Sequence, residues 1–355
     1  MHILYIVGRE LGYTRNDVLL RAFRRLGTVQ VIGETSAGSL SLRIGRVLMR
    51  ALPYLLTQRY DLIFVGFYGH LLMLPIGLLA RSPILFDAFV STYDTLCFDR
   101  GLFAPRSIVG RFAFWLDQTS CRRADMVLLD TRAHADYFVR TFALPRDKVG
   151  FLPVGCDEDI FFPRPHVKRD NITRILYYST YLPLHGVETV VRAAALLRSE
   201  QRLHFRLIGT GPEYVRVRQL VNALRLENIT FVPFVPLQDL AIEIAHADIC
   251  LGGHFGSSEK ATRVIAGKTF QCIAMNKPTI VGDNAANREL FQHGHDAWLC
   301  QMNDHEALAE AILHLTDSPD LCFQLGNNAR QTFLERASIQ IVSNQLDKIV
   351  KSLIG

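Results

Sequence analysis

The sequence predicts an α/β protein built from two doubly wound, parallel-sheet domains. Short apolar runs alternate with helical patterns along the chain, which is typical of sheets made from strand–helix–strand units. The chain has 355 residues, too many for one ordinary hydrophobic core, and fits two domains of usual size. Residues 154–171, rich in proline and charge, break both patterns. We therefore expect the domains to join there and to bind ligands in a cleft at the carboxyl ends of their strands.

Each half of the chain supplies its own set of predicted strands, recognised as short runs rich in apolar and β-branched residues. In the first half they are residues 2–7, 29–32, 62–66, 83–87, 126–129 and 149–152. In the second half they are residues 174–179, 204–208, 229–232, 248–251, 279–282 and 297–300. Helices are predicted near residues 16–26, 107–122, 186–199, 212–225, 237–246, 259–276, 286–293, 304–316 and 319–335. A last helix at 338–353 follows when the second domain is already complete.

Composition indicates a globular enzyme, because 49% of the residues are hydrophobic and 21% charged. The seven cysteines are scattered and odd in number, without a CxxC pair, which predicts reduced thiols in a cytoplasmic protein. The twelve histidines show no HExxH or other ligand spacing, so we predict no bound metal. We also expect no cofactor. We expect no secretory signal before the first strand. The net charge of +5 is mild, and we expect no nucleic-acid partner.

The positive charge is concentrated at the start of the chain. Within residues 36–60, Arg43, Arg46 and Arg50 recur at intervals of three and four, so a helix would place them on one face beside leucine and methionine. This pattern predicts peripheral association with an anionic membrane surface. The alternative is a core-packed helix whose arginines simply face water.

Two loops of the second half have the composition of anion-binding turns. His185 and Gly186 open a helix directly after a strand, and a helix start offers free backbone N–H groups to an anion. Gly209 and Gly211 follow the next strand, where glycine lets the backbone turn tightly and approach a ligand. Either turn could equally be a plain strand–helix connection.

The stretch from 253 to 283 is the most informative. It places Lys260, Arg263 and Lys268 within nine positions of one another, close to a glycine-rich loop. Three cations beside such a backbone predict a diphosphate site. In the first half, Asp87, Ser91 and Asp94 follow a buried strand, and Gly8 and Arg9 follow the first strand. We expect the former three to face an acceptor and the latter two to face the same cleft, unless they serve only loop capping and turns.

The motifs HGVET (185–189), IGTGPE (208–213), AMNKPTI (274–280) and ANREL (286–290) occur in a familiar order. Over roughly residues 172–340 the chain resembles the retaining glycosyltransferases of family 4, which have the GT-B fold. The resemblance implies a Rossmann-like acceptor domain at 1–160, joined by the returning C-terminal helix at 338–355. It also implies a Rossmann-like domain at 171–337 that binds a nucleotide-diphosphate sugar. The acceptor is expected to be a glycan or a lipid-linked molecule at the inner face of the membrane.

The chain departs from this family at its best-known positions. The glutamates of the family's E-x7-E pair fall on Arg263 and Gln271, and its phosphate-binding Arg and Lys fall on Thr180 and His185. We therefore expect Lys260, Arg263, Lys268 and His185 to hold the diphosphate, Gln271 to contact ribose hydroxyls, and Glu289 to contact the sugar.

Two alternatives stay open at this point. One is a non-catalytic, nucleotide-sugar-binding pseudo-transferase subunit, which the missing glutamates favour. The other is a nucleotide-sugar epimerase or hydrolase of the same fold. That enzyme would need acid and base residues in the second-domain cleft, and those are the residues that this sequence lacks.

Overall fold

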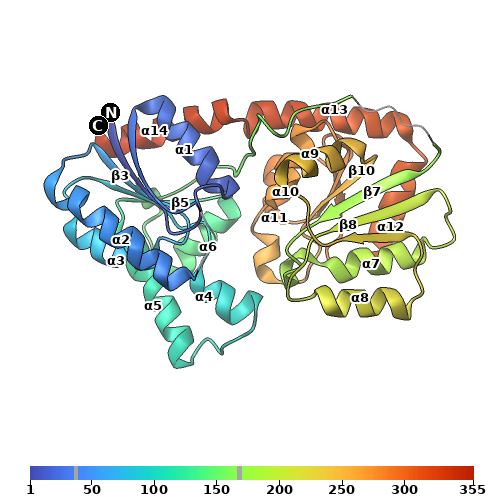
Figure 1. The fold of residues 1–355 in the computed structure, drawn as a ribbon, viewed down its shortest axis with the longest axis horizontal. Helices are drawn as coiled ribbons and strands as arrows, with labels where there is room; N and C mark the ends of the chain where they lie inside the picture. Colours follow the sequence, from blue (N-terminus) through green and yellow to red (C-terminus); the bar gives the residue numbers. More distant parts are fainter. Residues whose placement is uncertain (36–38, 166–169) are drawn as a thin grey trace. The chain divides into compact units, whose positions relative to one another are not determined.

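The computed structural model describes residues 1–35, 39–165 and 170–355 and divides the chain into two compact units (Figure 1). Unit 1 comprises Met1–Gly155 and Ser338–Gly355, and unit 2 comprises Cys156–Ala337. Residues 36–38 of the predicted arginine helix and 166–169 of the predicted linker lie outside the described residues. Each unit contains a six-stranded sheet in which neighbouring strands are parallel. The prediction of two doubly wound parallel sheets is confirmed.

The sheet of unit 1 has the strand order β2-β1-β3-β4-β5-β6. Its strands are β1 (His2–Ile6), β2 (Thr28–Ile32), β3 (Leu62–Val65), β4 (Ile84–Asp87), β5 (Met126–Leu129) and β6 (Val149–Phe151). Its helices are α1 (Thr14–Leu26), α2 (Leu40–Thr57), α3 (His70–Leu79), α4 (Thr92–Asp94), α5 (Ile108–Arg123), α6 (Arg132–Phe142) and α14 (Ile339–Ile354). One apolar core joins α1 and α14 to one face of the sheet, and a second joins α2, α3, α5 and α6 to the other. The last helix of the chain therefore packs on the first unit, as expected.

The sheet of unit 2 has the strand order β12-β11-β10-β7-β8-β9. Its strands are β7 (Thr173–Tyr178), β8 (Leu203–Ile208), β9 (Ile229–Val232), β10 (Ile249–Gly253), β11 (Thr279–Gly282) and β12 (Trp298–Cys300). Its helices are α7 (Val187–Leu196), α8 (Tyr214–Ala223), α9 (Leu237–His246), α10 (Gly267–Ala274), α11 (Ala285–Leu290), α12 (His305–Thr316) and α13 (Pro319–Arg336). The order reverses between β7 and β10. In open α/β sheets, ligands bind at the carboxyl ends of the two strands where such a reversal occurs.

The helix predicted at 259–276 is two separate elements. A 3-10 turn covers Glu259–Thr262, and α10 begins only at Gly267 after an extended residue, Ala266. The intervening Val264 and Ile265 are buried and β-branched, and such residues lose side-chain freedom in a helix. Packing of these side chains therefore outweighs continuation of the helix. Lys260 and Lys268 come from different elements as a result.

The three arginines of α2 do not form one exposed face, so that prediction was wrong for Arg43. Its side chain is 3% exposed and donates from Nε to the carbonyl oxygen of Gly8 at 2.9 Å, while Nη1 pairs with Glu10. Arg46 and Arg50 are exposed, but both lie beside the carboxylate of Glu34. Arg43 thus turns inward to hydrogen-bond acceptors of unit 1, although its spacing from Arg46 and Arg50 predicts an exposed position. Within the described ranges, no helix has the length and hydropathy needed to cross a bilayer.

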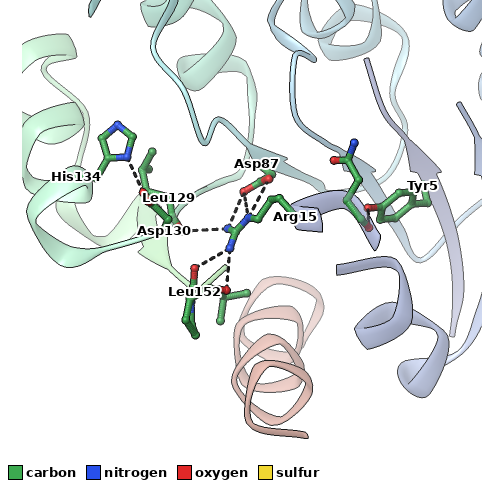
Figure 2. Close-up of polar contacts among 9 residues, drawn as sticks. Tyr5, Arg15, Asp87, Leu129, Asp130, His134 and Leu152 are labelled. Atoms are coloured by element: carbon green, nitrogen blue, oxygen red, sulfur yellow. Dashed lines mark hydrogen bonds and ion pairs between the residues drawn. The ribbon is translucent and has the colours of Figure 1, made fainter. Parts of the chain in front are cut away.

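One arginine of α1 ties together the carboxyl ends of three strands of unit 1 (Figure 2). The guanidinium of Arg15 is fully buried and lies 2.8 Å, from Nη2 to Oδ1, from the equally buried carboxylate of Asp87 at the end of β4. Its other N–H groups donate to the carbonyl oxygens of Leu129 at 3.1 Å, Leu152 at 2.7 Å and Pro153 at 3.0 Å. Burial raises the pKa of Asp87, and the charge of Arg15 opposes that rise. Each charge therefore depends on the other for its compensation in a dry environment.

We expect Arg15→Met to lower the free energy of unfolding of unit 1 by about 3–5 kcal/mol, because it leaves the Asp87 carboxylate buried without its partner. Asp87→Asn should also lower it, because Arg15 loses its counter-ion, but by less, since the amide oxygen still accepts from Arg15 and the three carbonyl contacts remain. Hydrogen exchange of β4 and β5 during urea unfolding measures the loss of stability in each variant, with the strands of unit 2 as an internal reference. Equal losses in the two variants would contradict this account.

Candidate functional site

The ammonium group of Lys268 lies at the point where the strand order of unit 2 reverses. From α10, Nζ donates to the carbonyl oxygen of Tyr178, the last residue of β7, at 3.1 Å. Nζ also lies 3.8 Å from the centre of the Tyr177 ring. A Cβ atom placed on Gly253, the last residue of β10, would be 3.5 Å from Nζ. Lys268 is buried, so its charge sits at the carboxyl ends of both strands with little contact with water.

Two imidazoles stack beside this lysine. His185 follows β7 and His254 follows β10, and their ring centroids are 5.3 Å apart with the planes 6° from parallel. The backbone N–H of Leu182 donates to Nδ1 of His185 at 3.3 Å, which leaves the Nε2 of a neutral ring to carry the proton. His254 is buried, and its Nδ1 has no hydrogen-bond partner among the described residues. Such an atom is available to a ligand.

The lysines and histidines of this group influence one another's protonation. Burial and the charges of Lys268 and Lys260 lower the pKa of His254 to about 3. The pKa of His185 falls well below its usual value, because of burial first and then the neighbouring Lys268, His254 and Lys260. Burial also lowers the pKa of Lys268 to about 7. Near neutral pH, the site therefore holds two uncharged imidazoles and one lysine that is poised to gain or lose a proton.

The backbone brings a helix start to the same place. Gly186 has φ +65° and precedes α7, and a Cβ atom there would come within 2.3 Å of the backbone carbon of Phe255. Only glycine fits both the left-handed conformation and this close approach. The loop after β10 thus lies against the start of α7, whose first N–H groups have no partner within the helix. Helix starts of this kind attract anions.

Gly209 and Gly211 bring the loop after β8 onto the loop after β7. A Cβ atom on Gly209 would lie 1.9 Å from the carbonyl oxygen of Ser179, and one on Gly211 would lie 1.9 Å from that of Thr180. Both glycines have positive φ, +125° and +156°. They are required for the contact between these two loops.

Gln271 has an internal partner. It lies one turn after Lys268 on α10, is buried, and accepts a hydrogen bond at Oε1 from the hydroxyl of Tyr178 at 2.7 Å. Lys260, in the turn before α10, is also buried. Arg263 closes that turn, with Nη1 3.9 Å from Glu259. These residues lie on the α10 side of the group formed by Lys268, His185 and His254.

Glu289 lies near the end of α11 and is partly buried. Asn284 caps α11 by accepting from the N–H of Asn287 at 2.8 Å. The amide nitrogen of Asn284 donates to the carbonyl oxygen of Ala261 at 3.3 Å, which joins α11 to the turn that carries Lys260. The predicted sugar contact at Glu289 stays a prediction.

The residues predicted to face an acceptor are all buried in unit 1. Asp87 is paired with Arg15. Ser91 donates to Asp117 at 2.7 Å and accepts from the N–H of Asp94 at 2.9 Å, so it caps α4. This arrangement favours the alternative of capping and internal pairing over a direct acceptor contact.

Gly8 and Arg9 are the two predicted donor-site residues that lie in unit 1. Arg9 pairs with Glu10 at 2.7 Å, and its guanidinium lies over the rings of Tyr13 and Tyr68, 5.4 and 5.5 Å from their centres. The carbonyl oxygen of Gly8 is occupied by Arg43. A contact of either residue with a nucleotide-sugar stays a prediction.

Two residues of the site escaped the sequence analysis, His254 and Tyr178. The signal for His254 was its position directly after two glycines at a predicted strand end. Nothing in the sequence distinguished Tyr178, whose hydroxyl donates to Gln271 on α10. The assembled group of two lysines, two imidazoles and a helix start can bind a multiply charged anion and donate several hydrogen bonds to it.

Comparisons with known proteins place this site in a recognised domain. Residues 158–332 match the family of glycosyl transferases group 1. N-acetyl-alpha-D-glucosaminyl L-malate synthase of Bacillus anthracis is 27% identical over 176 residues, which is 49% of this chain and 44% of that protein. The chain therefore spans less than half the length of this curated relative.

Two solved structures resemble the fold along the whole chain. One is sucrose-phosphate synthase of Thermosynechococcus elongatus, with a TM-score of 0.78, 16% identity and coverage of 99% of this chain and 98% of that one. The other is HepE of Anabaena in complex with UDP-glucose, with a TM-score of 0.74, 16% identity and coverage of 99% of both chains. The chain thus has the GT-B fold, and its segment 158–332 matches the family model of the glycosyl transferases group 1.

Proposed function

We propose that this protein transfers a sugar from a nucleotide-diphosphate sugar to a glycan or lipid-linked acceptor, with retention of configuration and without a metal ion. The observation that carries the proposal is the buried group of Lys268, His185 and His254 at the strand reversal of unit 2. This unit is also the one that matches the glycosyl transferases group 1. Binding of UDP and UDP-glucose by HepE supports a nucleotide-sugar as the ligand.

The diphosphate is the part of the ligand that this group suits. Its negative charge would lie between Lys268 and the start of α7, with Lys260 near enough to the two imidazoles to lower their pKa. The N–H groups of neutral His185 and His254 would complete hydrogen bonds to its oxygens. Because a retaining transfer leaves negative charge on the departing diphosphate, donors fixed in a dry site stabilise the transition state most.

The remaining parts of the ligand have separate candidates. We propose that the amide nitrogen of Gln271 donates to a ribose hydroxyl while its oxygen stays bonded to Tyr178. Glu289 and Arg263 are the candidates for contacts with the transferred sugar and the outer phosphate. The loop with Gly209 and Gly211 would bring backbone groups close to the nucleoside. The seven free cysteines support a cytoplasmic location for the reaction.

A non-catalytic binding protein is the second candidate. Two observations favour it: Gln271 and Arg263 occupy the places of the family's glutamates, and Asp87, Ser91 and Asp94 are engaged within unit 1. Such a protein would bind the nucleotide-sugar and leave it intact.

Incubation with a panel of nucleotide-sugars, beginning with UDP-glucose, separates these functions. We expect slow release of the nucleoside diphosphate, and proton NMR of the freed sugar should show the anomeric configuration of the donor. Interconverted nucleotide-sugars would indicate an epimerase instead. Binding without turnover of any member of the panel would favour the non-catalytic protein.

Lys268→Met should weaken nucleotide-sugar binding about tenfold to a hundredfold, because it removes a charge-assisted contact while keeping the length of the side chain. Lys277→Met is the matched control. The Lys277 ammonium is also partly buried beside α10, but it donates to the carbonyl oxygens of Ala245 and Ala247 at 2.6 and 2.9 Å. Calorimetric titration of both folded variants measures the difference. Unchanged affinity in Lys268→Met would show that Lys268 does not contact the nucleotide-sugar.

The same lysine predicts how binding depends on pH. The pKa of Lys268 is about 7 in the empty site, and a bound diphosphate should raise it. Below pH 7 the lysine is charged before and after binding, so affinity is highest there. Above pH 7 the protein must take up a proton to bind, so affinity should fall as pH rises, by up to about tenfold per pH unit. Titrations in buffers of different ionisation enthalpy should show this uptake at pH 8, and Lys268→Met should abolish it.

The role of Gln271 can be separated from its bond to Tyr178. Gln271→Leu removes both the internal bond and the amide nitrogen, whereas Tyr178→Phe removes only the internal bond. We expect Gln271→Leu to lower nucleotide-sugar affinity about three- to tenfold and Tyr178→Phe to leave it almost unchanged. Equal affinities in the two variants would mean that Gln271 only packs against β7.

A further inference from the structure

Unit 1 carries a dense group of exposed apolar side chains away from its sheet. The group lies within residues 98–115, which we call the apolar tip and which Figure 1 shows as the connection from the end of α4 into α5. Its large exposed side chains are Phe98, Leu102, Phe103, Ile108, Val109, Phe112 and Trp115. Single exposed apolar residues need no explanation, but a group of them concentrated in one short segment usually marks an interaction surface.

The backbone of the apolar tip holds these side chains outward in a defined conformation. The N–H of Leu102 donates to the carbonyl oxygen of Leu96 at 2.9 Å, which closes the turn that follows α4. Ser107 caps α5 by accepting from the N–H of Gly110 at 3.1 Å. The exposure is therefore built into the fold and does not reflect a lack of local structure.

The first turns of α5 have two distinct faces. Ile108, Phe112 and Trp115, spaced by four and three residues, lie on the exposed face, and Ile108 is 89% exposed. The rings of Phe112 and Trp115 are 5.6 Å apart, so they form one apolar ridge. Ala113 and Leu116 point the other way and are buried. Apart from Arg111, these turns of α5 are therefore apolar on the exposed side as well as on the buried side, whereas the exposed side of a helix is usually polar.

The exposed charges of the apolar tip are all positive. Arg100, Arg106 and Arg111 are exposed, and none of them takes part in an ion pair within the described part of the chain. The acid of this segment, Asp99, is buried. The charges that residues 98–115 expose are therefore all cations, which complements a negatively charged partner.

We propose that the apolar tip inserts into the headgroup region of a bilayer that contains anionic lipid. Tryptophan and phenylalanine are suited to the membrane–water interface, and arginines beside them attract anionic headgroups. The tip fits this role better than α2, where Arg43 is buried and Arg46 and Arg50 share Glu34. In combination with the proposed function, such a surface would hold the enzyme where a lipid-linked acceptor lies.

The test uses the full chain and two kinds of vesicle, phosphatidylcholine alone and phosphatidylcholine with phosphatidylglycerol. We expect binding to the anionic vesicles, weakened by salt. Ile108→Asp with Phe112→Asp should reduce it about a hundredfold, because two apolar side chains leave the interface. Arg106→Gln with Arg111→Gln should reduce it about fivefold per arginine at low salt.

Two matched controls carry an Asp at an equally exposed apolar position elsewhere. Phe234→Asp changes a side chain of unit 2 that is 78% exposed, and Met49→Asp changes one on α2 that is 67% exposed. Both should bind vesicles as the unaltered protein does. In a Trp298→Phe background, the fluorescence of Trp115 should shift to the blue on anionic vesicles and be quenched by brominated lipid.

Several results would overturn the proposal. They are equal recovery with neutral and anionic vesicles, loss of binding in Met49→Asp alone, or self-association of the protein through the tip without vesicle binding. Nucleotide-sugar binding, measured by calorimetry on the same proteins without lipid, is expected to be unaffected by the tip variants. Failure of the lipid proposal would therefore leave the proposed transfer reaction untouched.

Discussion

The reversal of strand order beside β7 is the constraint on which the candidate site depends. After β7 the chain adds β8 and β9 on one side of that strand, and it then returns to place β10 on the other side. The connection through α7 therefore leads away from β7 toward one edge of the sheet, and the connection through α10 leads away from β10 toward the other edge. Lys268 reaches the carboxyl ends of both strands from α10, and His185 and His254 lie beside it in the two loops. The chemistry of the site thus follows from the topology, because side chains from the loop after β7, the loop after β10 and α10 meet there.

The two units treat a buried cation in opposite ways. In unit 1, Arg15 is paired with Asp87 and donates to three carbonyl oxygens, so its charge is compensated within the protein. In unit 2, the ammonium of Lys268 has one carbonyl oxygen and the face of a tyrosine ring, and its pKa falls to about 7. A buried charge without a counter-ion lowers stability, and an anionic ligand removes that cost. The contrast supports a structural role for the Arg15 pair and a binding role for Lys268.

The strands could be predicted from sequence because a buried parallel strand is a short apolar run, and such runs are visible without knowledge of the fold. The predictions that were wrong concerned features that depend on contacts between distant segments. The break before α10 arises from packing of Val264 and Ile265, and the inward turn of Arg43 arises from acceptors on Gly8 and Glu10. The cations of the site were predictable from their spacing and glycine-rich surroundings. His254 was not, because its position gains meaning only when β10 is known to lie beside β7.

The proposed donor site and the apolar tip both attract negative charge, but they should respond differently to salt. The lysines and histidines of unit 2 are largely buried, and counter-ions in solution screen buried charges only weakly. Arg100, Arg106 and Arg111 lie in water, where raised ionic strength weakens attraction to a charged surface within a Debye length of about 8–10 Å. Salt can therefore release the tip from a membrane while the donor site stays occupied. The fold then keeps recognition of the small anion independent of recognition of the lipid surface, although both rely on basic side chains.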